Sequence, residues 1–324
     1  MRGSLSLGLG TLILSAAAAA TGMTYRRYRK EMRELCAELA ASSQLSETKV
    51  GPIEYGRHGH GRPVLAIHGA GGGFDQGLAI GDLLFSSGFQ VIAPSRFGYL
   101  NTALPEKASP AAQADAHVAL LDALGIDQAI VFGVSAGAPS AIETALRHPQ
   151  RVAALILAVP RAFAPNGPIA PPEDSAAMLE TVMAGADFAF WAAAKVARRQ
   201  VVRFLGVDPD LEARATPAER AQVTEIIRHI LPLSRRLAGL EHDSETRIHE
   251  WPLERIRTPT LIISAKDDGY RTLEAARYTA ERISGAELMV LESGGHLMVG
   301  RGAEVRAGIQ RFLERIPAPL AAAA

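Results

Sequence analysis

The sequence predicts an α/β protein with a mostly parallel central sheet of about eight strands and helices on both faces. Short apolar runs alternate along most of the chain with segments of helical periodicity, as in parallel sheets. With 324 residues and 48% hydrophobic composition, the chain can bury a large core. This length favours one large domain with an insertion over two independent domains.

The expected elements follow the hydrophobic pattern in chain order. A helix over 28–41 precedes a short antiparallel strand over 49–55, which begins the sheet. Ser109 is a good N-cap, the next residue is proline, and Gly125 is a good stop, so a helix is expected over 109–124. The other strands are expected at 63–68, 89–94, 129–134, 152–158, 259–264 and 286–291, and the other helices at 76–87, 136–148, 272–283 and 303–315.

The pentapeptide Gly133–Gly137 reads Gly-x-Ser-x-Gly and lies between the apolar run 129–132 and an alanine-rich helical stretch. A strand, a sharp turn and a helix around such a serine form a nucleophile elbow. The turn strains the backbone of the serine, and small flanking residues let the strand and the helix pass closely. Ser135 is therefore the expected nucleophile, projecting from the sheet edge.

A glycine-rich loop, His68–Gly73, follows the strand expected over 63–68. Because it has almost no side chains, its backbone N–H groups are open to a substrate and suit an oxyanion hole. The expected donors are the N–H of Ala70 or Gly71, together with that of Ala136. No Gly-Lys-Ser/Thr sequence follows the loop, which argues against a phosphate-binding loop.

Two further polar residues follow strands near the end of the chain. Asp268 comes after the strand that ends at Ser264, and His296 comes after the strand that ends at Leu291. Parallel strands gather reactive groups at their carboxyl ends, so both side chains are expected beside the elbow. Asp267 is adjacent, and only one of the two aspartates can face the histidine.

With these four motifs in this order, the chain resembles the α/β-hydrolase superfamily over roughly residues 48–316. The resemblance implies a triad in which Ser135 attacks, His296 is the general base and Asp268 orients it, with no cofactor and no metal. The acid of this superfamily usually stands in a G-x-x-D pattern. Here Ala265 takes the glycine position, and the pattern selects Asp268. Members with an aspartate nucleophile are excluded because position 135 is serine.

Carboxylic esters with a small apolar acyl group are the first substrate class that the resemblance implies. Carbon–carbon-bond hydrolases and cofactor-free haloperoxidases of the superfamily have similar loops and caps, so both remain open. A receptor that binds a small apolar molecule on the same fold is an alternative of another class. The intact set of motifs argues against the receptor, and turnover of a short ester would discriminate. The natural substrate and the oligomeric state stay open.

About a hundred residues separate the strand ending at Val159 from the strand starting at Thr260, far more than an ordinary connection. Apolar residues in this stretch recur at helical spacing. Residues 161–256 are therefore expected to form a helical cap over the active site. Residues 28–160 and 257–324 are then expected to form the hydrolase core. Arg96 or Phe97 is a candidate to border the pocket, with no role assigned.

Composition excludes several other classes of protein. Equal numbers of basic and acidic residues, 34 of each, provide no field for nucleic acid, and no nucleic-acid partner is expected. The single cysteine, Cys36, rules out an internal disulfide framework. His58 and His60 lie on a glycine-rich turn without a third ligand nearby, so they are interpreted as surface groups.

The N-terminal segment 1–27 is expected to be a membrane anchor or a signal segment. Residues 3–25 carry no charge and would span about 34 Å as a helix, enough to cross a bilayer. One arginine precedes this stretch and four basic residues follow it within 26–30, which favours an uncleaved anchor with the catalytic domain in the cytoplasm. The alternative is export after cleavage, since Ala18–Ala20 fits an A-x-A site.

Overall fold

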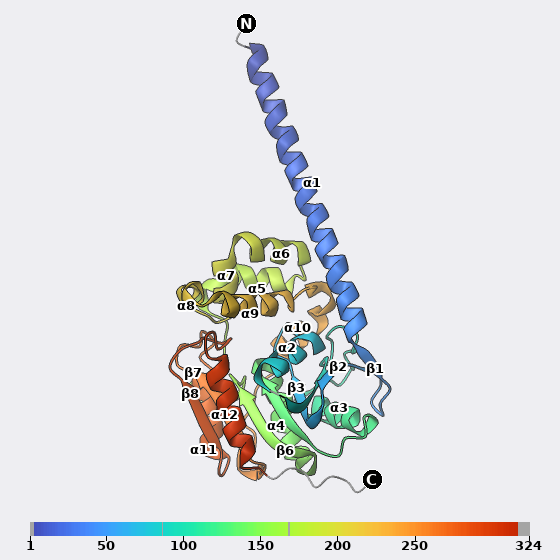
Figure 1. Cartoon of the computed structure of the whole chain (residues 1–324), viewed down its shortest axis with the longest axis vertical. Helices are drawn as coiled ribbons and strands as arrows, with labels where there is room; N and C mark the ends of the chain where they lie inside the picture. Colours follow the sequence, from blue (N-terminus) through green and yellow to red (C-terminus); the bar gives the residue numbers. More distant parts are fainter. Residues whose placement is uncertain (1–2, 86, 168, 317–324) are drawn as a thin grey trace. The chain divides into compact units, whose positions relative to one another are not determined.

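The computed structural model describes residues 3–85, 87–167 and 169–316, although not the side chains of residues 3–21 and of Glu173. The chain divides into two compact units, residues 1–42 and residues 43–324 (Figure 1).

The first unit is one helix, α1, Gly3–Ser42. It is continuous across the stretch 3–25 and the helix expected over 28–41. Among the residues whose side chains are described, no helix is long and apolar enough to cross a membrane. These residues therefore do not support the predicted anchor. The side chains of residues 3–21, which make up most of it, are not described.

The second unit is built on a sheet of eight strands in the order β1-β2-β4-β3-β5-β6-β7-β8. β3 to β8 are parallel, and β1 and β2 join antiparallel at one edge. The predicted mostly parallel sheet of about eight strands is confirmed. The strands are β1 Gln44–Ser46, β2 Ile53–Gly59, β3 Gly61–Ile67, β4 Gly88–Pro94, β5 Ala129–Val134, β6 Val152–Ala158, β7 Thr260–Ala265 and β8 Glu287–Leu291.

The first strands of the sheet differ from the expectation of one strand over 49–55. The N–H of Gly51 donates to the carbonyl of Thr48 at 3.1 Å, and Gly51 has a φ of 103°, so a turn occupies this position. β2 therefore begins only at Ile53. The edge strand β1, Gln44–Ser46, was not expected, because three largely exposed residues leave no hydrophobic alternation to detect.

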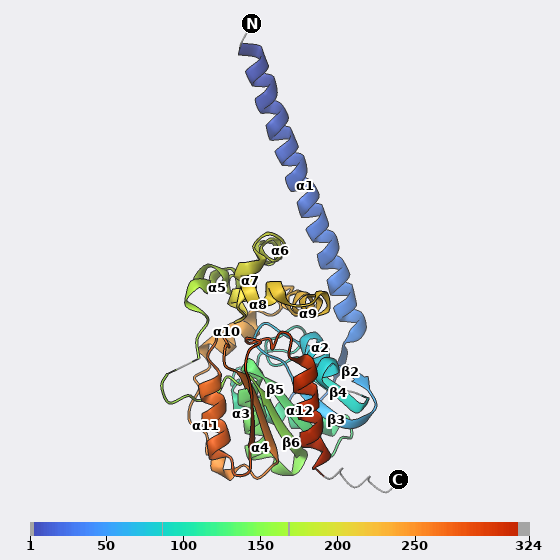
Figure 2. The same cartoon turned by 60° about the vertical axis from the view of Figure 1, so that its left-hand side comes forward.

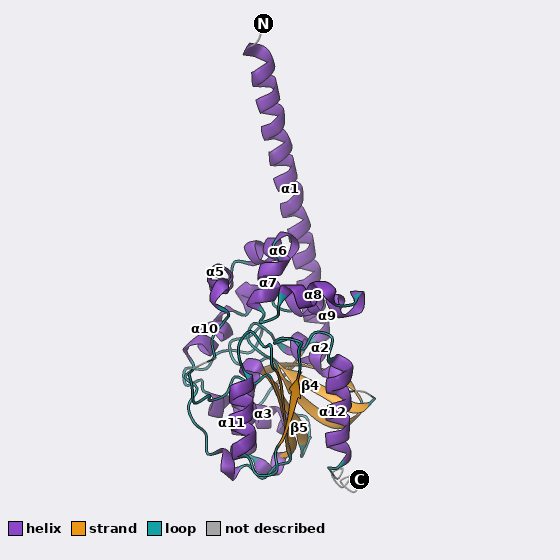
Figure 3. Ribbon diagram, turned by 90° about the vertical axis from the view of Figure 1, so that its left-hand side faces the viewer, coloured by secondary structure: helices purple, strands orange, loops and turns teal. Residues whose placement is uncertain are grey.

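Helices cover both faces of the sheet (Figure 3). Side chains of β3 alternate between the two faces: Leu65 and Ile67 pack in one apolar cluster, Val64 and Ala66 in the other. One face is covered by α3 Pro110–Ala123, α4 Ala138–Arg147 and α11 Leu273–Arg282, and the other by α2 Phe74–Leu84 and α12 Gly302–Glu314. These five helices lie within three residues of their expected bounds.

The long connection between β6 and β7 is helical, with α5 to α9 gathered at one end of the sheet (Figure 2). Local sequence signals mark where its helices begin. At the start of α9, for example, Thr216 and Glu219 form a capping box, and Pro217 occupies the first helical position. The helices are α5 Ala176–Met183, α6 Asp187–Val196, α7 Arg198–Phe204, α8 Pro209–Arg214, α9 Pro217–Arg228 and α10 Leu237–Glu245.

Candidate active site

Ser135 stands on a sharp turn between β5 and α4. Its φ is 50°, a left-handed conformation that a non-glycine residue adopts only when its surroundings impose it. The flanking glycines explain how the turn fits. A Cβ at Gly137 would lie 2.6 Å from the carbonyl oxygen of Ile67, and one at Gly133 would lie 2.7 Å from the Cβ of Ala141. Close packing of the turn against β3 and α4 thus requires glycine on both sides.

Ser135, His296 and Asp268 form a continuous chain of hydrogen-bonding distances. Nε2 of His296 lies 2.9 Å from Oγ of Ser135, and Nδ1 lies 3.1 and 3.0 Å from the two carboxylate oxygens of Asp268. The carboxylate only accepts, so Nδ1–H donates to it and Nε2 is left as an acceptor for the serine hydroxyl. The structure therefore brings together the three side chains predicted from separate loops.

The Asp268 carboxylate is fully buried and held by further donors. The N–H of Tyr270 donates to it at 2.9 Å, and the hydroxyl of Thr272 also donates to it. Burial alone would raise the pKa of Asp268. The electrostatic attraction to His296 and the hydrogen bonds together outweigh burial, so they lower the pKa of Asp268 below its ordinary value. Asp268 is therefore ionised at neutral pH.

Asp267 binds the backbone of the loop that carries the imidazole. Its exposed carboxylate accepts the N–H groups of Gly294 and Gly295 at 3.1 and 2.9 Å. The two adjacent aspartates thus contact different parts of the histidine loop, one its backbone and the other the His296 ring.

The glycine-rich loop His68–Gly73 lies beside Ser135. The N–H of Gly71 donates to the hydroxyl of Tyr99 at 3.4 Å. Among the loop, turn and cap hydrogen bonds of the described residues, none is donated by the N–H of Ala70 or by that of Ala136. Of the two loop donors expected from the sequence, Ala70 is the one whose N–H stays available.

A cavity of about 400 Å³ opens on this site. Ser135, His296 and Ala70 form part of its wall, and the rest is mostly apolar side chains from the core and from the β6–β7 connection. The connection contributes Val182 of α5 and Val223 of α9, among others. An apolar wall beside hydrogen-bonding groups is typical of small-molecule sites.

Gly206, which follows α7, contacts the histidine loop and was not identified from the sequence. Its carbonyl accepts the N–H groups of His296 and Gly269, each at 3.0 Å. The hydroxyl of Tyr270 donates to the carbonyl of Phe204 at 2.8 Å, and the Tyr270 ring lies 4.7 Å from the His296 ring. A lone glycine in a long insertion carries no sequence signal for such a contact.

His58, interpreted as a surface group, lies 3.0 Å from the exposed Asp82 through Nδ1. Among the described residues, no group of three or more His, Cys, Asp or Glu side chains converges as metal ligands do.

Comparison with known proteins identifies the family. The model of the alpha/beta hydrolase fold matches residues 62–302, and the chain therefore belongs to the α/β-hydrolase family, an enzyme of the hydrolase class. It is 29% identical to the uncharacterized hydrolase YcgS of Bacillus subtilis over 82% of this chain and 95% of that one. It is also 29% identical to 2-hydroxymuconate semialdehyde hydrolase of Pseudomonas putida, over 74% of this chain and 82% of that one. The structure of an α/β hydrolase fold protein from Nakamurella multipartita superposes with a TM-score of 0.67 at 30% identity, over 84% of this chain and 99% of that one.

Gly206→Ala should disturb the His296 imidazole. A Cβ at this position would lie 2.7 Å from the Cβ of His296 and 2.6 Å from the Tyr270 ring. Gly185→Ala is a matched control in the same connection, because φ is positive at both positions, 73° and 60°. A Cβ at Gly185 would lie 3.3 Å from the Leu237 side chain and 3.7 Å from the Ser234 backbone, without a severe clash. Both variants should lose about 1 to 2 kcal/mol of stability from backbone strain.

We expect only the Gly206 variant to lose hydrolase turnover by more than tenfold. Melting temperature and initial rate on one ester measure the two effects separately. Equal turnover in the two variants would show that Gly206 does not hold the imidazole.

Proposed function

We propose that the protein is a serine hydrolase that cleaves carboxylic esters of apolar acyl groups. One observation carries the proposal: the hydrogen-bonded chain from Ser135 through His296 to Asp268 opens onto an apolar cavity. In this assignment Ser135 is the nucleophile, His296 is the general base and Asp268 orients the imidazole and stabilises its charged form.

The proposed reaction proceeds in two halves. Oγ of Ser135 attacks the ester carbonyl while Nε2 of His296 takes its proton, and the imidazolium then gives this proton to the leaving alkoxide. Water next loses a proton to His296 and attacks the acyl group. The Ser135 oxygen leaves, regains its proton from His296, and the carboxylic acid departs.

The N–H groups of Ala70 and Ala136 are the proposed oxyanion donors. Negative charge develops on the carbonyl oxygen in both halves of the reaction, and one absent donor typically costs on the order of 3 kcal/mol of transition-state stabilisation. Ala70 is preferred to Gly71 because the Gly71 N–H already donates to Tyr99.

We further propose that residues 161–256 act as a cap over the core formed by 28–160 and 257–324. Side chains from this segment line the cavity together with core residues, and apolar side chains over the site limit the access of bulk water to the acyl-enzyme. The volume of about 400 Å³ suits a small or medium acyl chain.

Carbon–carbon-bond hydrolysis is the second candidate function. The observation that favours it is the 29% identity to 2-hydroxymuconate semialdehyde hydrolase of Pseudomonas putida over most of both chains. The two candidates differ in the bond broken and share the site. Comparison of kcat/KM for a vinylogous diketone and for an acyl ester of similar size decides between them.

For residues 1–27 we propose a membrane anchor that leaves the hydrolase unit in the cytoplasm. The support is the uncharged stretch 3–25 with its basic residues on the C-terminal side.

Ser135→Ala should abolish labelling by a fluorophosphonate and lower ester turnover by several orders of magnitude. The melting temperature should hardly change, because one hydroxyl contributes little to stability. Ser244→Ala is the matched control, since Ser244 also lines the cavity and its hydroxyl donates only to the carbonyl of Glu241. Labelling should persist in that variant. A labelled Ser135→Ala protein would contradict the assignment.

The two adjacent aspartates provide a second test. Asp268→Asn should leave the imidazole with the wrong tautomer and reduce turnover by roughly 10⁴-fold, as the equivalent change does in serine proteases. Asp267→Asn removes charge only from the backbone contacts of Gly294 and Gly295, so turnover should change by less than about tenfold. Steady-state rates on one ester compare the two. A larger loss for Asp267→Asn would reverse the assignment.

Membrane attachment is tested by comparing the full chain with a variant that lacks residues 1–27. We expect the full chain to stay in the membrane pellet after carbonate extraction, and the shortened protein to be recovered in solution with its esterase activity. Extraction of the full chain by carbonate would contradict the anchor. A mature protein that starts near Thr21 would show a cleaved signal instead.

A further inference from the structure

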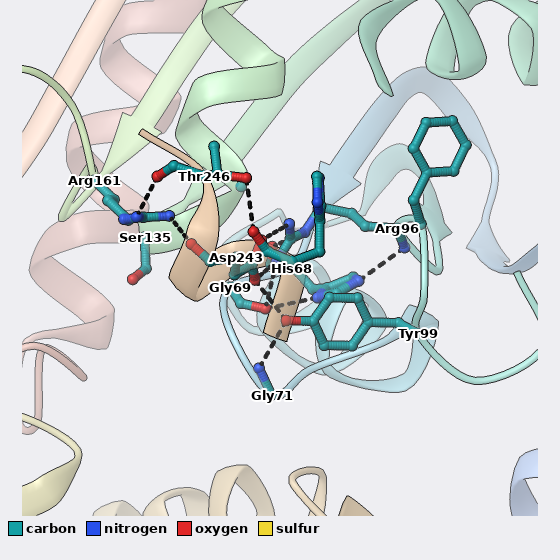
Figure 4. Close-up of polar contacts among 12 residues, drawn as sticks. His68, Gly69, Gly71, Arg96, Tyr99, Ser135, Arg161, Asp243 and Thr246 are labelled. Atoms are coloured by element: carbon teal, nitrogen blue, oxygen red, sulfur yellow. Dashed lines mark hydrogen bonds and ion pairs between the residues drawn. The ribbon is translucent and has the colours of Figure 1, made fainter. Parts of the chain in front are cut away.

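Arg96, in the loop after β4, is a buried cation that binds the backbone of the glycine-rich loop. Its Nε donates to the carbonyl of His68 at 3.1 Å, and its Nη2 donates to the carbonyl of Gly69 at 3.2 Å (Figure 4). The N–H of Arg96 donates to Nε2 of His68 at 2.9 Å, and Nδ1–H of His68 donates to Gly69 at 2.7 Å. The carbonyl of Gly69 therefore receives hydrogen bonds from two side chains.

The peptide group held in this way is the one that contains the proposed oxyanion donor. The carbonyl of Gly69 and the N–H of Ala70 belong to the same planar unit, and in a trans peptide they point in opposite directions. Holding the carbonyl toward Arg96 consequently fixes the direction of the Ala70 N–H. A cation on the carbonyl also polarises the amide and strengthens its N–H as a donor, most of all in a buried site.

Asp243 of α10 holds the guanidinium in this position. Its carboxylate accepts from Nη1 and Nη2 of Arg96 at 2.7 Å each, and from the hydroxyl of Tyr99 at 2.5 Å. Burial alone would lower the pKa of Arg96, but the charge and hydrogen bonds of Asp243 raise it, so the guanidinium stays charged. Tyr99 in turn accepts the N–H of Gly71.

Arg161 ties the end of α10 to the nucleophile turn. Its guanidinium donates to the backbone carbonyls of Asp243 and Thr246 at 2.8 and 2.9 Å (Figure 4), and its N–H donates to the carbonyl of Ser135 at 3.0 Å. A cation at a helix C-terminus satisfies its last carbonyls and its dipole. The position of the Asp243 carboxylate is thereby fixed relative to Ser135.

We propose that Arg96 is a positioning residue of the oxyanion hole: paired with Asp243, it orients and polarises the Gly69–Ala70 peptide so that the Ala70 N–H donates to the transition-state oxyanion. The inference rests on the proposed serine hydrolase function. It assigns the β6–β7 connection, through Asp243, a part in transition-state stabilisation in addition to lining the cavity.

A second buried arginine–carboxylate pair provides the matched control. Arg236, which precedes α10, is completely buried and donates to both carboxylate oxygens of Asp75 at 3.1 and 2.8 Å. Within the described part of the chain, its guanidinium also donates to the carbonyl of Leu231, and it makes no hydrogen bond to residues 68–70 of the loop. Arg236→Lys therefore breaks a buried bidentate pair, as Arg96→Lys does, at a site that does not contact the Gly69–Ala70 peptide.

The test uses the full chain and a trifluoromethyl ketone, which forms a tetrahedral adduct with the serine. Fluorine NMR follows the pH titration of the adduct oxygen, so the pKa of that oxygen reports how well the site stabilises an oxyanion. In Arg96→Lys the single ammonium cannot bridge the carboxylate and the loop carbonyls together. We expect the pKa of the adduct oxygen to rise by about one unit or more, corresponding to at least tenfold weaker stabilisation.

In steady state on one ester, Arg96→Lys should lower kcat by about 10- to 100-fold, while KM stays within threefold of the wild-type value. This loss of kcat is smaller than the loss expected when a whole oxyanion donor is removed. Arg236→Lys should keep kcat within threefold and leave the pKa of the adduct oxygen unchanged. Asp243→Asn, nearly the same in shape, should shift this pKa in the same direction, so it tests the inference if Arg96→Lys does not fold.

An unchanged adduct pKa in a folded Arg96 or Asp243 variant would overturn the inference, even if kcat falls. A wild-type protein that forms no adduct would overturn the proposed hydrolase function itself. If the wild type forms the adduct and the pKa of the adduct oxygen is the same in both arginine variants, the hydrolase function holds and only the role of Arg96 is contradicted.

Discussion

The structure depends on one constraint, the tight packing that forces a left-handed backbone at Ser135. A strand, a turn and a helix converge there so closely that only glycine fits on either side of the serine. Such strain, of order 1 to 3 kcal/mol, persists only where the surroundings over-determine the conformation. The other non-glycine residues with positive φ in the described chain also follow strands of the parallel sheet, at Leu100, Val159, Arg271 and Met298. The sheet thus concentrates its backbone strain in the loops that form the site.

Buried charge is the second organising element, and it joins segments distant in sequence. Arg96 and Asp243 are separated by 147 positions, and Arg236 and Asp75 by 161, yet both pairs are bidentate and largely shielded from water. Buried ion pairs of this kind contribute little net stability, although breaking one is costly. Their effect here is geometric, because they fix where the β6–β7 connection meets the core. Hydrophobic contacts alone would allow more ways of packing.

The sequence predicts the sheet and the triad residues, but not the contacts that the helical connection makes with the site. Parallel strands and their covering helices were predictable because each follows a local hydrophobic pattern, and four loop motifs in order located Ser135, Asp268 and His296. The contacts of Gly206 and Asp243 were not predictable, since both residues lie in the helical connection and bind loops far away in the chain. The edge strand β1 was missed because it is short and largely exposed. For Arg96, the sequence indicates only a candidate position at the border of the pocket.

The pairing of Arg96 with Asp243 limits how the helical connection can be exchanged in protein engineering. A transplanted segment that lacks a carboxylate where Asp243 stands would leave a guanidinium unpaired in a water-poor interior, which costs several kcal/mol. Such a chimaera would have to change the loop after β4 as well, or supply an acid from the new helix. Exchanges of this segment between related hydrolases should therefore treat the helical segment and the loop after β4 as one module.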